Sequence, residues 1–126
     1  MQVLVDSSVW IEYFRGGNKS DDLDILIDEN LIAVNDLILT EIVPFLRLQN
    51  KRKLIRLMNS IFKYEMKIDW SQIIEFQSKC LKKGINGVGV PDLLIAQNAI
   101  QNRCEIFTLD QHFSLMKNPL NLKLFK

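Results

Sequence analysis

The side chains best suited to chemistry in this sequence are four carboxylates that lie far apart along the chain: Asp6, Glu41, Asp92 and Asp110. Taken singly, each acid is more often structural than functional. Close together, they would repel one another, and each would raise the pKa of the others. A hard divalent cation removes that cost, and oxygen-only ligands favour Mg²⁺ or Mn²⁺. Two such ions about 3.5–4 Å apart can activate a water and stabilise the leaving oxygen in phosphodiester hydrolysis.

The elements around two of these acids predict that they meet. Asp6 directly follows Val3–Val5, a short apolar run typical of a buried parallel strand. Asp110 lies just past residues 104–108, which are predicted to form another strand. Because the carboxyl ends of parallel strands form the ligand crevice of a doubly wound sheet, both acids point to the same edge.

The other two acids are predicted on helices. Pro91 suits the first turn of a helix that runs to about Asn102, so Asp92 stands at the helix start, where complementing the helix dipole is its alternative role. Glu41 has apolar neighbours, among which an unpaired charge is costly, so it is either paired or near a metal. All four acids are therefore expected at the ends of elements that converge on one edge.

The helix that carries Glu41 has an ambiguous start. Asn35 or Thr40 can cap it. Pro44 sits inside the same pattern, so the helix either begins late or kinks there. Pro44 follows Glu41 by three residues and can therefore alter how the helix presents its carboxylate.

Helices and strands alternate along the rest of the chain. Ser8 can cap a short helix that runs to Phe14. The other expected elements are a helix at 22–29, a strand at 31–34, a basic helix at 51–59, a strand or extended linker at 62–68, a helix from a capping box at Asp69 and Gln72 to about Lys83, a loop at 84–89 and a last short strand at 121–125. This alternation predicts an α/β fold with a parallel sheet.

Length and composition predict one globular domain over residues 1–126. Hydrophobic residues make up 48% and charged residues 25% of the 126 positions, so a disordered chain is not expected. The chain opens without a basic leader and apolar core, and no apolar run approaches the ~18 residues of a membrane span. We therefore expect a cytoplasmic protein with no signal peptide and no membrane segment.

Several kinds of site are excluded by residue counts and spacing. Two cysteines exclude a disulfide framework, and these two together with the single histidine are too few for a closed zinc site built from Cys and His alone. One histidine also excludes a ribonuclease that uses two histidines as acid and base. The glycine-rich segment GINGVG at 84–89 matches neither the dinucleotide-binding nor the phosphate-loop pattern, so a plain mobile loop is expected there.

Four short segments match the acidic motifs of one known family: VLVDSS at 3–8, LTEI at 39–42, PDLLIA at 91–96 and TLDQHF at 108–113. They occur in the family's order and at its spacing, in a chain of the right length. The sequence thus resembles the PIN-domain nucleases, and among them the VapC-like toxins of prokaryotic type II toxin–antitoxin pairs. The resemblance covers essentially the whole chain.

This resemblance implies a fold, a reaction and a set of site residues. The implied fold is a three-layer α/β/α sandwich with a short, mainly parallel central sheet, and the implied activity is a Mg²⁺- or Mn²⁺-dependent endoribonuclease that leaves a 5′-phosphate and a 3′-hydroxyl. The residues that match the family's metal-binding and catalytic acids are Asp6, Glu41, Asp92 and Asp110. Ser8 matches the small polar residue that supports the first acid, and Thr108 matches the hydroxyl residue before the last.

One position departs from the family pattern. Many members carry a further acid two positions past the fourth, and this chain has His112 there. A fifth acidic contact to the metal is therefore in doubt. A surface or satisfied histidine is the favoured interpretation, and contact with a phosphate is the alternative.

Charge is distributed unevenly along the chain. Residues 1–46 hold nine acids and two bases, a net charge of −7, whereas residues 47–83 hold ten bases and three acids, a net charge of +7. The candidate RNA surface is the basic helix and its approach: Arg47, Lys51, Arg52, Lys53 and Arg56. Phosphate neutralisation supplies most non-specific affinity for nucleic acid. Solvated faces that neutralise each other are the alternative.

Partner proteins are a further implication of the resemblance. VapC-like toxins form homodimers and bind a cognate antitoxin whose tail lies across the cleft, and an acidic first segment would suit such a tail. Trp10, Ile11, Tyr13 and Phe14 exceed one helix face, so some of them are expected to meet another element of the domain or another chain.

Three other interpretations stay open. The first is a PIN-like nuclease of ordinary RNA processing that has no antitoxin. The second is a non-catalytic binding module of the same fold, which the presence of all four acids disfavours. The third is an aspartate-phosphorylated enzyme or receiver, but the second Asp of such phosphatases is replaced by Ser8, and the acidic pair of a receiver is not evident.

Overall fold

The computed structural model describes residues 2–17 and 21–125, and its strands form a parallel sheet. The strands are β1 (Val3–Val5), β2 (Ile32–Val34), β3 (Phe62–Lys63) and β4 (Ile106–Phe107), in the order β3-β2-β1-β4. Each of the three strand pairings is parallel. β1 and β2 contain only apolar residues and are buried along their whole length, as parallel strands covered on both faces are.

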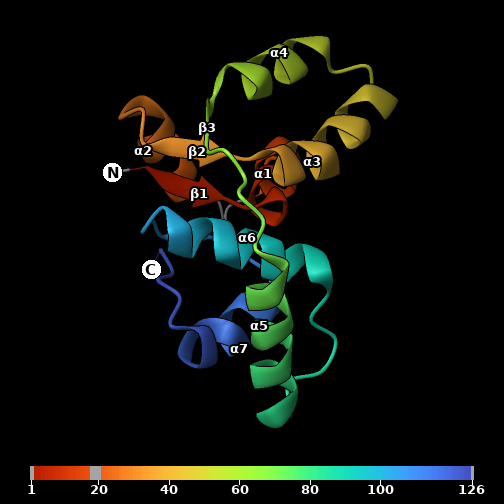
Figure 1. The fold of residues 1–126 in the computed structure, drawn as a ribbon. Coiled ribbons are helices and arrows are strands. Elements are labelled where there is room, and N and C mark those ends of the chain that lie inside the picture. Colours follow the sequence, from red (N-terminus) through yellow and green to blue (C-terminus); the bar gives the residue numbers. More distant parts are fainter. Residues whose placement is uncertain (1, 18–20, 126) are drawn as a thin grey trace.

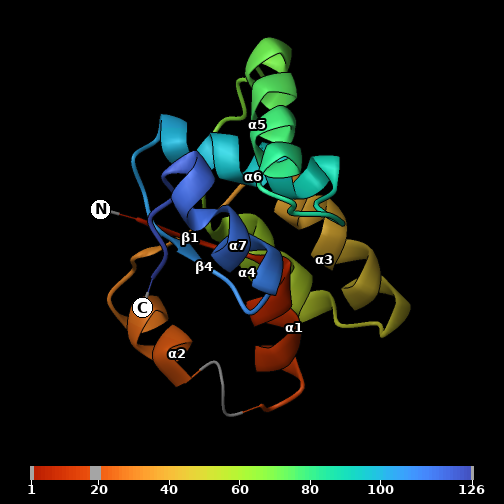
Figure 2. The same ribbon diagram turned by 90° about the horizontal axis from the view of Figure 1, so that it is seen from below.

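The strands are connected by helices that lie on both sides of the sheet (Figure 1). The helices are α1 (Ser7–Phe14), α2 (Asp21–Asp28), α3 (Asp36–Leu48), α4 (Arg52–Ser60), α5 (Trp70–Lys82), α6 (Val90–Gln101) and α7 (Gln111–Leu120). Figure 2 shows α5 and α6 on one side of β1 and β4, and α1 and α2 on the opposite side. The predicted α/β/α layering and parallel sheet are thus confirmed. No helix of the described residues is long and apolar enough to cross a membrane.

The strand order places a topological switch between β1 and β4. From β1 the chain moves outward to β2 and β3, and it then returns to place β4 on the other side of β1. In open α/β sheets, ligands bind outside the carboxyl ends of the strands at such a switch point. Asp6 follows β1, and Thr108 follows β4, so both stand at this point.

The apolar side chains of the first helix pack within the chain. Trp10 is completely buried and stacks on Phe14, with 5.8 Å between the ring centroids. Tyr13 packs edge-on against Trp10, and its hydroxyl donates a hydrogen bond of 2.8 Å to Asp24 on α2. Ile11 is partly buried against the same core. Of the two expected destinations for these side chains, the structure shows the one inside the domain.

Helix α3 begins early and continues through its proline. Asn35 caps it by accepting a hydrogen bond of 2.9 Å from the backbone amide of Ile38, so a late start at Thr40 is wrong. Pro44 cannot donate to the carbonyl of Thr40, but both residues are exposed, and water can take the place of the missing N–H group. The helix therefore holds Glu41 in its middle turn.

The predicted capping box of α5 forms only in part. Asp69 caps the helix by accepting from the backbone amide of Gln72 at 3.2 Å, but its own amide donates to Gln97 Oε1 at 3.1 Å instead of to Gln72. Gln97 Nε2 in turn donates to Asp69 O at 3.0 Å and to Gln72 Oε1 at 2.7 Å. A buried amide from α6 thus takes the place that the sequence pattern assigns to the local glutamine.

The C-terminal segment differs most from the sequence-based expectation. Helix α7 was not expected, although Phe113, Met116 and Leu120 have helical spacing and are buried. Residues 121–125 do not form a strand, since only a single bridge joins Leu124 to Ile106. The segment at 62–68 is a strand only over Phe62–Lys63 and continues as an irregular crossing to α5.

Candidate active site

The Asp6 carboxylate is buried at the carboxyl end of β1. Only 4% of the residue is exposed. Ser8 Oγ donates to Asp6 Oδ2 at 2.8 Å, and Thr108 Oγ1 donates to the same oxygen at 3.0 Å. Burial raises the pKa of Asp6, and these two hydrogen bonds oppose the rise without cancelling it. The carboxylate is therefore fixed in direction, yet costly to keep ionised when no cation is near.

The same two hydroxyls connect Asp6 to the turn that follows β4. Ser8 Oγ accepts from the backbone amide of Leu109 at 3.0 Å, and Thr108 Oγ1 accepts from that of Asp110 at 3.0 Å. Each hydroxyl has one hydrogen, and each directs it at Asp6. Ser8 therefore does not cap α1 as expected, because Asp6 occupies the cap position and the hydroxyl of Ser8 is engaged across the site.

Glu41 approaches the same region from α3. Ser7 Oγ donates to Glu41 Oε1 at 3.3 Å, which joins the first turn of α1 to α3. Partial burial raises the pKa of Glu41, and the charges of Asp6, Asp92 and Asp110 raise it further, whereas the bond from Ser7 lowers it. All four predicted acids therefore lie within electrostatic range of one another.

Asp92 and Asp110 both face the imidazole ring of His112. His112 Nδ1 is 3.3 Å from Asp110 Oδ1 and 3.5 Å from Asp92 Oδ2. One possible ligand atom from each of these three residues lies within 4.8 Å of the other two, whereas Asp6 and Glu41 are outside this group. Burial raises the pKa of Asp92, Asp110 adds to the rise, and His112 opposes it. Asp110 also caps α7, accepting from the amide of His112 at 2.9 Å.

The glycine-rich segment at 84–89 borders the site. The backbone amide of Gly89, which caps α6, forms a hydrogen bond with the Asp92 carboxylate that lowers the pKa of this acid. Gly87 has a φ of 82°, and a Cβ built on it would stand 3.5 Å from His112 Nε2. This segment was expected to be a plain loop, and the structure places it against two side chains of the site.

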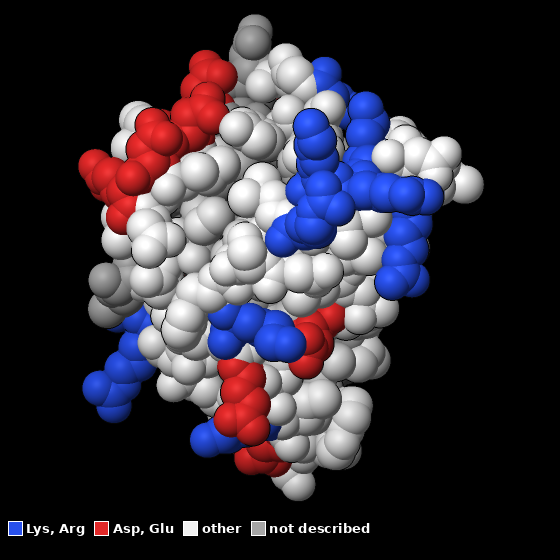
Figure 3. Space-filling model, turned by 90° about the horizontal axis from the view of Figure 1, so that it is seen from above, with Lys and Arg blue, Asp and Glu red and all other residues white. Residues whose placement is uncertain are grey.

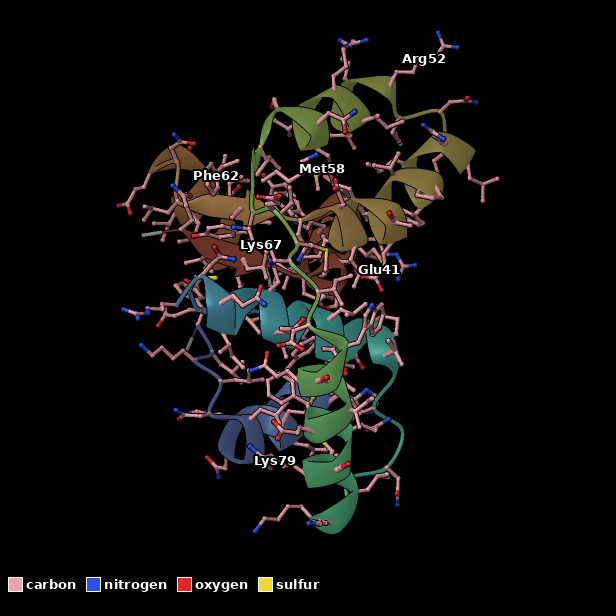
Figure 4. All side chains as sticks on the ribbon, viewed as in Figure 1. Glu41, Arg52, Met58, Phe62, Lys67 and Lys79 are labelled. Atoms are coloured by element: carbon pink, nitrogen blue, oxygen red, sulfur yellow. The ribbon has the colours of Figure 1, made fainter. Side chains whose placement is uncertain are left out.

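The predicted RNA surface is separate from the carboxylates. Its five basic residues are all exposed, and they come from the last turn of α3 and from α4: Arg47, Lys51, Arg52, Lys53 and Arg56. Figure 3 shows a group of Lys and Arg side chains at the upper right of this face and a group of Asp and Glu side chains at its upper left, with side chains of both kinds next to one another lower down. In Figure 4, Arg52 lies on the outer side of α4, and Glu41 lies on the opposite side of the α3–α4 pair.

The family-model comparison decides the family. The PIN domain model matches residues 3–118, nearly the whole chain. The chain belongs to the PIN-domain family. No curated protein sequence matches it.

Solved structures share the fold of this PIN-domain protein. A chain in the complex VapBC2 from Rickettsia felis, bound to a DNA fragment from its promoter, has a TM-score of 0.77 and 21% identity, covering 99% of this chain and 98% of that one. A chain of FitAcB from Neisseria gonorrhoeae has a TM-score of 0.70 and 19% identity, covering 99% and 97%. A chain of DNA-bound VapBC from Salmonella typhimurium has a TM-score of 0.76 and 13% identity, also covering 99% and 97%.

Some side chains of the PIN-domain site were missed by sequence analysis. Ser7 was not predicted, because its partner Glu41 lies 34 residues away along the chain. The contacts of Gly87 and Gly89 could not be found from spacing, since they depend on where the 84–89 segment folds. The ring of His112 was expected at the surface or in a satisfied position, and the structure places it beside the carboxylates of Asp92 and Asp110.

The donor set suits a hard divalent cation. The atoms that face one another are carboxylate oxygens, with a single imidazole nitrogen among them. The pKa values of Asp6, Glu41 and Asp92 are all raised, so the ionised cluster is costly by itself. A divalent cation would remove that cost, and Mg²⁺ or Mn²⁺ is the type of ion that oxygen ligands favour. The side chains present therefore fit the metal that the family implies.

Proposed function

We propose that this PIN-domain protein is a Mg²⁺- or Mn²⁺-dependent endoribonuclease whose single domain spans residues 1–126. The observation that carries the proposal is the convergence of four carboxylates at the switch point of the sheet: Asp6, Glu41, Asp92 and Asp110. Repulsion among the four carboxylates destabilises the folded protein, so a role in stability does not explain the cluster. PIN domains are typically nucleases, which agrees with a site built from acids.

The four acids have different tasks in this proposal. Asp6, fixed by Ser8 and Thr108, is the rigid member that sets the position of the cation. Asp92, in the first turn of α6, and Asp110, the N-cap of α7, complete the site together with Glu41 from α3. When bound, the cation supplies Lewis-acid activation of water and neutralises the charge that develops on the phosphate. No separate general base is then required.

The substrate would be held largely through its backbone. The basic cluster Arg47, Lys51, Arg52, Lys53 and Arg56 is exposed and close together in sequence, so it can neutralise several phosphates. Arg52 lies on the outer side of α4, on the opposite side of the α3–α4 pair from Glu41, so α4 would bind nucleotides away from the scissile bond (Figure 4). It would therefore govern affinity more than the rate of the chemical step.

The proposed biological role is that of a toxin paired with a cognate antitoxin. Structures that share the fold include VapBC complexes and a toxin–antitoxin complex from Klebsiella pneumoniae, in which the matched chain has a TM-score of 0.67 and 15% identity, with coverage of 90% and 91%. A homodimer is proposed as well. Its support is a row of exposed apolar side chains on α5: Trp70, Ile74 and Leu81.

The test of the activity is cleavage of end-labelled structured RNA. Purified protein is assayed with Mn²⁺ or with a chelator, beside Asp6→Asn and the matched control Asp36→Asn, whose carboxylate is exposed and pairs with Lys63 at 3.0 Å. We expect metal-dependent cutting by the wild type and by Asp36→Asn, and none by Asp6→Asn. Equal cutting by both variants would contradict the assignment of the acids.

The toxin role has its own test. Induced expression of the wild type in a bacterial host should arrest growth, whereas Asp6→Asn should not. Co-expression of a small neighbouring gene that encodes a DNA-binding protein should relieve the arrest. Normal growth under strong wild-type expression, with cleavage retained in the purified protein, would favour a nuclease of RNA processing.

A further inference from the structure

His112 lies in the site, but the proposed function gives it no role. It is the single histidine of the chain, and 36% of its side chain is exposed. Its Nδ1 atom faces Asp92 and Asp110, and its Nε2 atom would stand 3.5 Å from a Cβ built on Gly87. One ring nitrogen thus points into the carboxylate cluster, and the other points out of it.

The distances around Nδ1 are those of neighbouring ligands. A charge-assisted hydrogen bond between an imidazolium and a carboxylate would be about 2.7–2.9 Å long. The observed separations are 3.3 Å to Asp110 and 3.5 Å to Asp92, and Nδ1 makes no shorter contact with either acid. Adjacent ligands of a six-coordinate ion with bonds of about 2.1 Å lie about 3 Å apart. The two separations from Nδ1 are therefore close to the spacing of co-ligands.

The cap of α7 fixes this arrangement. Asp110 Oδ1 accepts the backbone amide of His112 at 2.9 Å, and the same oxygen is the one that faces Nδ1. This hydrogen bond holds the backbone of His112 against the Asp110 carboxylate, so the imidazole ring lies beside Asp110. The side chain of His112 is partly exposed, so Nε2 can bond with water, as the outer nitrogen of a metal-bound histidine commonly does.

We propose that His112 Nδ1 is a ligand of the divalent cation held by Asp92 and Asp110, and that this nitrogen makes the site favour Mn²⁺ over Mg²⁺. The inference rests on the metal site of the proposed function. Mg²⁺ takes oxygen ligands and gives up its waters reluctantly, whereas transition ions accept imidazole readily. A site with one nitrogen among its oxygens therefore discriminates between the two ions, and His112 is the residue that determines this specificity.

The experiment measures Mn²⁺ binding and does not depend on catalysis. Protein without a histidine tag is stripped with a chelator and titrated with Mn²⁺, with free Mn²⁺ followed by electron paramagnetic resonance. Pulsed resonance on the bound ion then reports whether nitrogen is directly coordinated. Because the chain has one histidine, an imidazole signal in tag-free protein can come only from His112. The variants are His112→Asn, His112→Asp and, as matched control, Gln111→Asn on the exposed side of the same helix start.

Substitution of His112 is expected to weaken Mn²⁺ binding more than Mg²⁺ binding. The wild type and Gln111→Asn should show directly bound nitrogen, and His112→Asn should lose that signal while it still binds Mn²⁺ about tenfold more weakly. Mg²⁺ affinity, measured by competition, should change by less than about twofold in His112→Asn. His112→Asp should lose the nitrogen signal and bind Mg²⁺ at least as tightly as the wild type does.

Two outcomes would overturn the inference, and they are distinguishable. If the wild type binds Mn²⁺ without a nitrogen signal and His112→Asn binds it equally well, the site holds a cation through carboxylates alone. In that case only the role of His112 fails. If the wild type binds neither ion at millimolar concentration, the metal site of the proposed function fails together with the inference.

Discussion

Asp6 is the most deeply buried of the four acids, so its ionised form is electrostatically costly. It is buried, and the salt bridges of residues 2–17 and 21–125 give it no cation. Two hydroxyl donors stabilise its ionised form, yet burial still raises its pKa above the ordinary value of 3.8. A group with such a raised pKa binds more protons in the folded than in the unfolded protein, so the free energy of unfolding falls as pH rises through the interval between the two pKa values.

The first prediction concerns this cost. In a metal-chelating buffer at pH 7, Asp6→Asn should melt a few degrees above the wild type, because it removes a charge that the fold opposes. Added Mn²⁺ should raise the Tm of the wild type and leave that of Asp6→Asn nearly unchanged, since the ion binds the folded state only. Thermal denaturation from pH 4 to pH 8 measures both effects. A lower Tm for Asp6→Asn in chelator would contradict the account.

The second prediction concerns Thr108. Thr108→Val keeps the shape of the side chain but removes a donor to Asp6 and an acceptor for the amide of Asp110. We expect a loss of about 1–3 kcal/mol in the free energy of unfolding. The pKa of Asp6 should rise further, because a bond to its ionised form is lost.

Urea denaturation and Mn²⁺ titration check the prediction for Thr108. The matched control is Thr40→Val, which removes only an exposed bond to the carbonyl of Asp36. Equal losses of unfolding free energy in the two variants would show that the Thr108 hydroxyl stabilises the fold no more than an exposed threonine hydroxyl does.

At the scale of the elements, local patterns predicted most helices and strands. Apolar runs such as Val3–Val5 and the capping signals at Asn35 and Asp69 act within a few residues, so the sequence displays them. The capping partner of Asp69 could not be predicted, because Gln97 lies 28 residues away along the chain. The acids of the site were predicted from their places at element ends, whereas the contacts of His112 depend on the turn after β4.

The third prediction tests a buried amide that joins two helices. Gln97 is 2% exposed and makes three hydrogen bonds that hold the start of α5 against α6. Gln97→Ala should lower the free energy of unfolding by about 2–3 kcal/mol, since buried partners are left unpaired. Gln101→Ala is the control, because Gln101 is exposed and makes one bond, to the carbonyl of Lys67. Urea denaturation of both variants should give a clearly larger loss for Gln97→Ala, and a reversed order would refute this assignment.

At the scale of the whole molecule, charge is separated in space as well as in sequence. The acidic residues of α2 and the basic residues of α4 lie on different elements, and the upper part of Figure 3 shows an acidic group and a basic group apart from each other. Such separation lets the basic side chains of α4 face a polyanion while the acidic side chains of α2 do not repel it. The carboxylate site lies in a third region, at the carboxyl ends of the parallel strands.

The fourth prediction concerns the basic cluster. Arg52→Glu combined with Arg56→Glu should raise the KM for RNA about tenfold near 0.1 M salt and leave kcat within about twofold. The slope of log KM against log salt should weaken by about 1.4–1.8, as expected when two phosphate contacts are lost. Steady-state cleavage at several salt concentrations measures this, with Lys79→Glu and Lys82→Glu on α5 as the matched pair. A fall in kcat alone would mean that α4 acts in the chemical step.

The fifth prediction concerns self-association. Ile74 is 68% exposed on α5, in one row with Trp70 and Leu81. If this row is the surface between two copies, Ile74→Glu should convert a dimer to a monomer in sedimentation experiments. Leu48→Glu is the control, because Leu48 is also highly exposed but lies at the end of α3. A dimer that survives Ile74→Glu would place the interface elsewhere.

The most direct test of the central claim is anomalous scattering from crystals soaked in millimolar Mn²⁺. The account predicts an anomalous peak among the carboxylates of Asp6, Glu41, Asp92 and Asp110 and beside His112 Nδ1, with ligand atoms at about 2.1–2.2 Å. A control soak in Mg²⁺ should show density there without the anomalous signal. Strong Mn²⁺ peaks elsewhere and none among these acids would contradict the claim that the four converging carboxylates form a metal site.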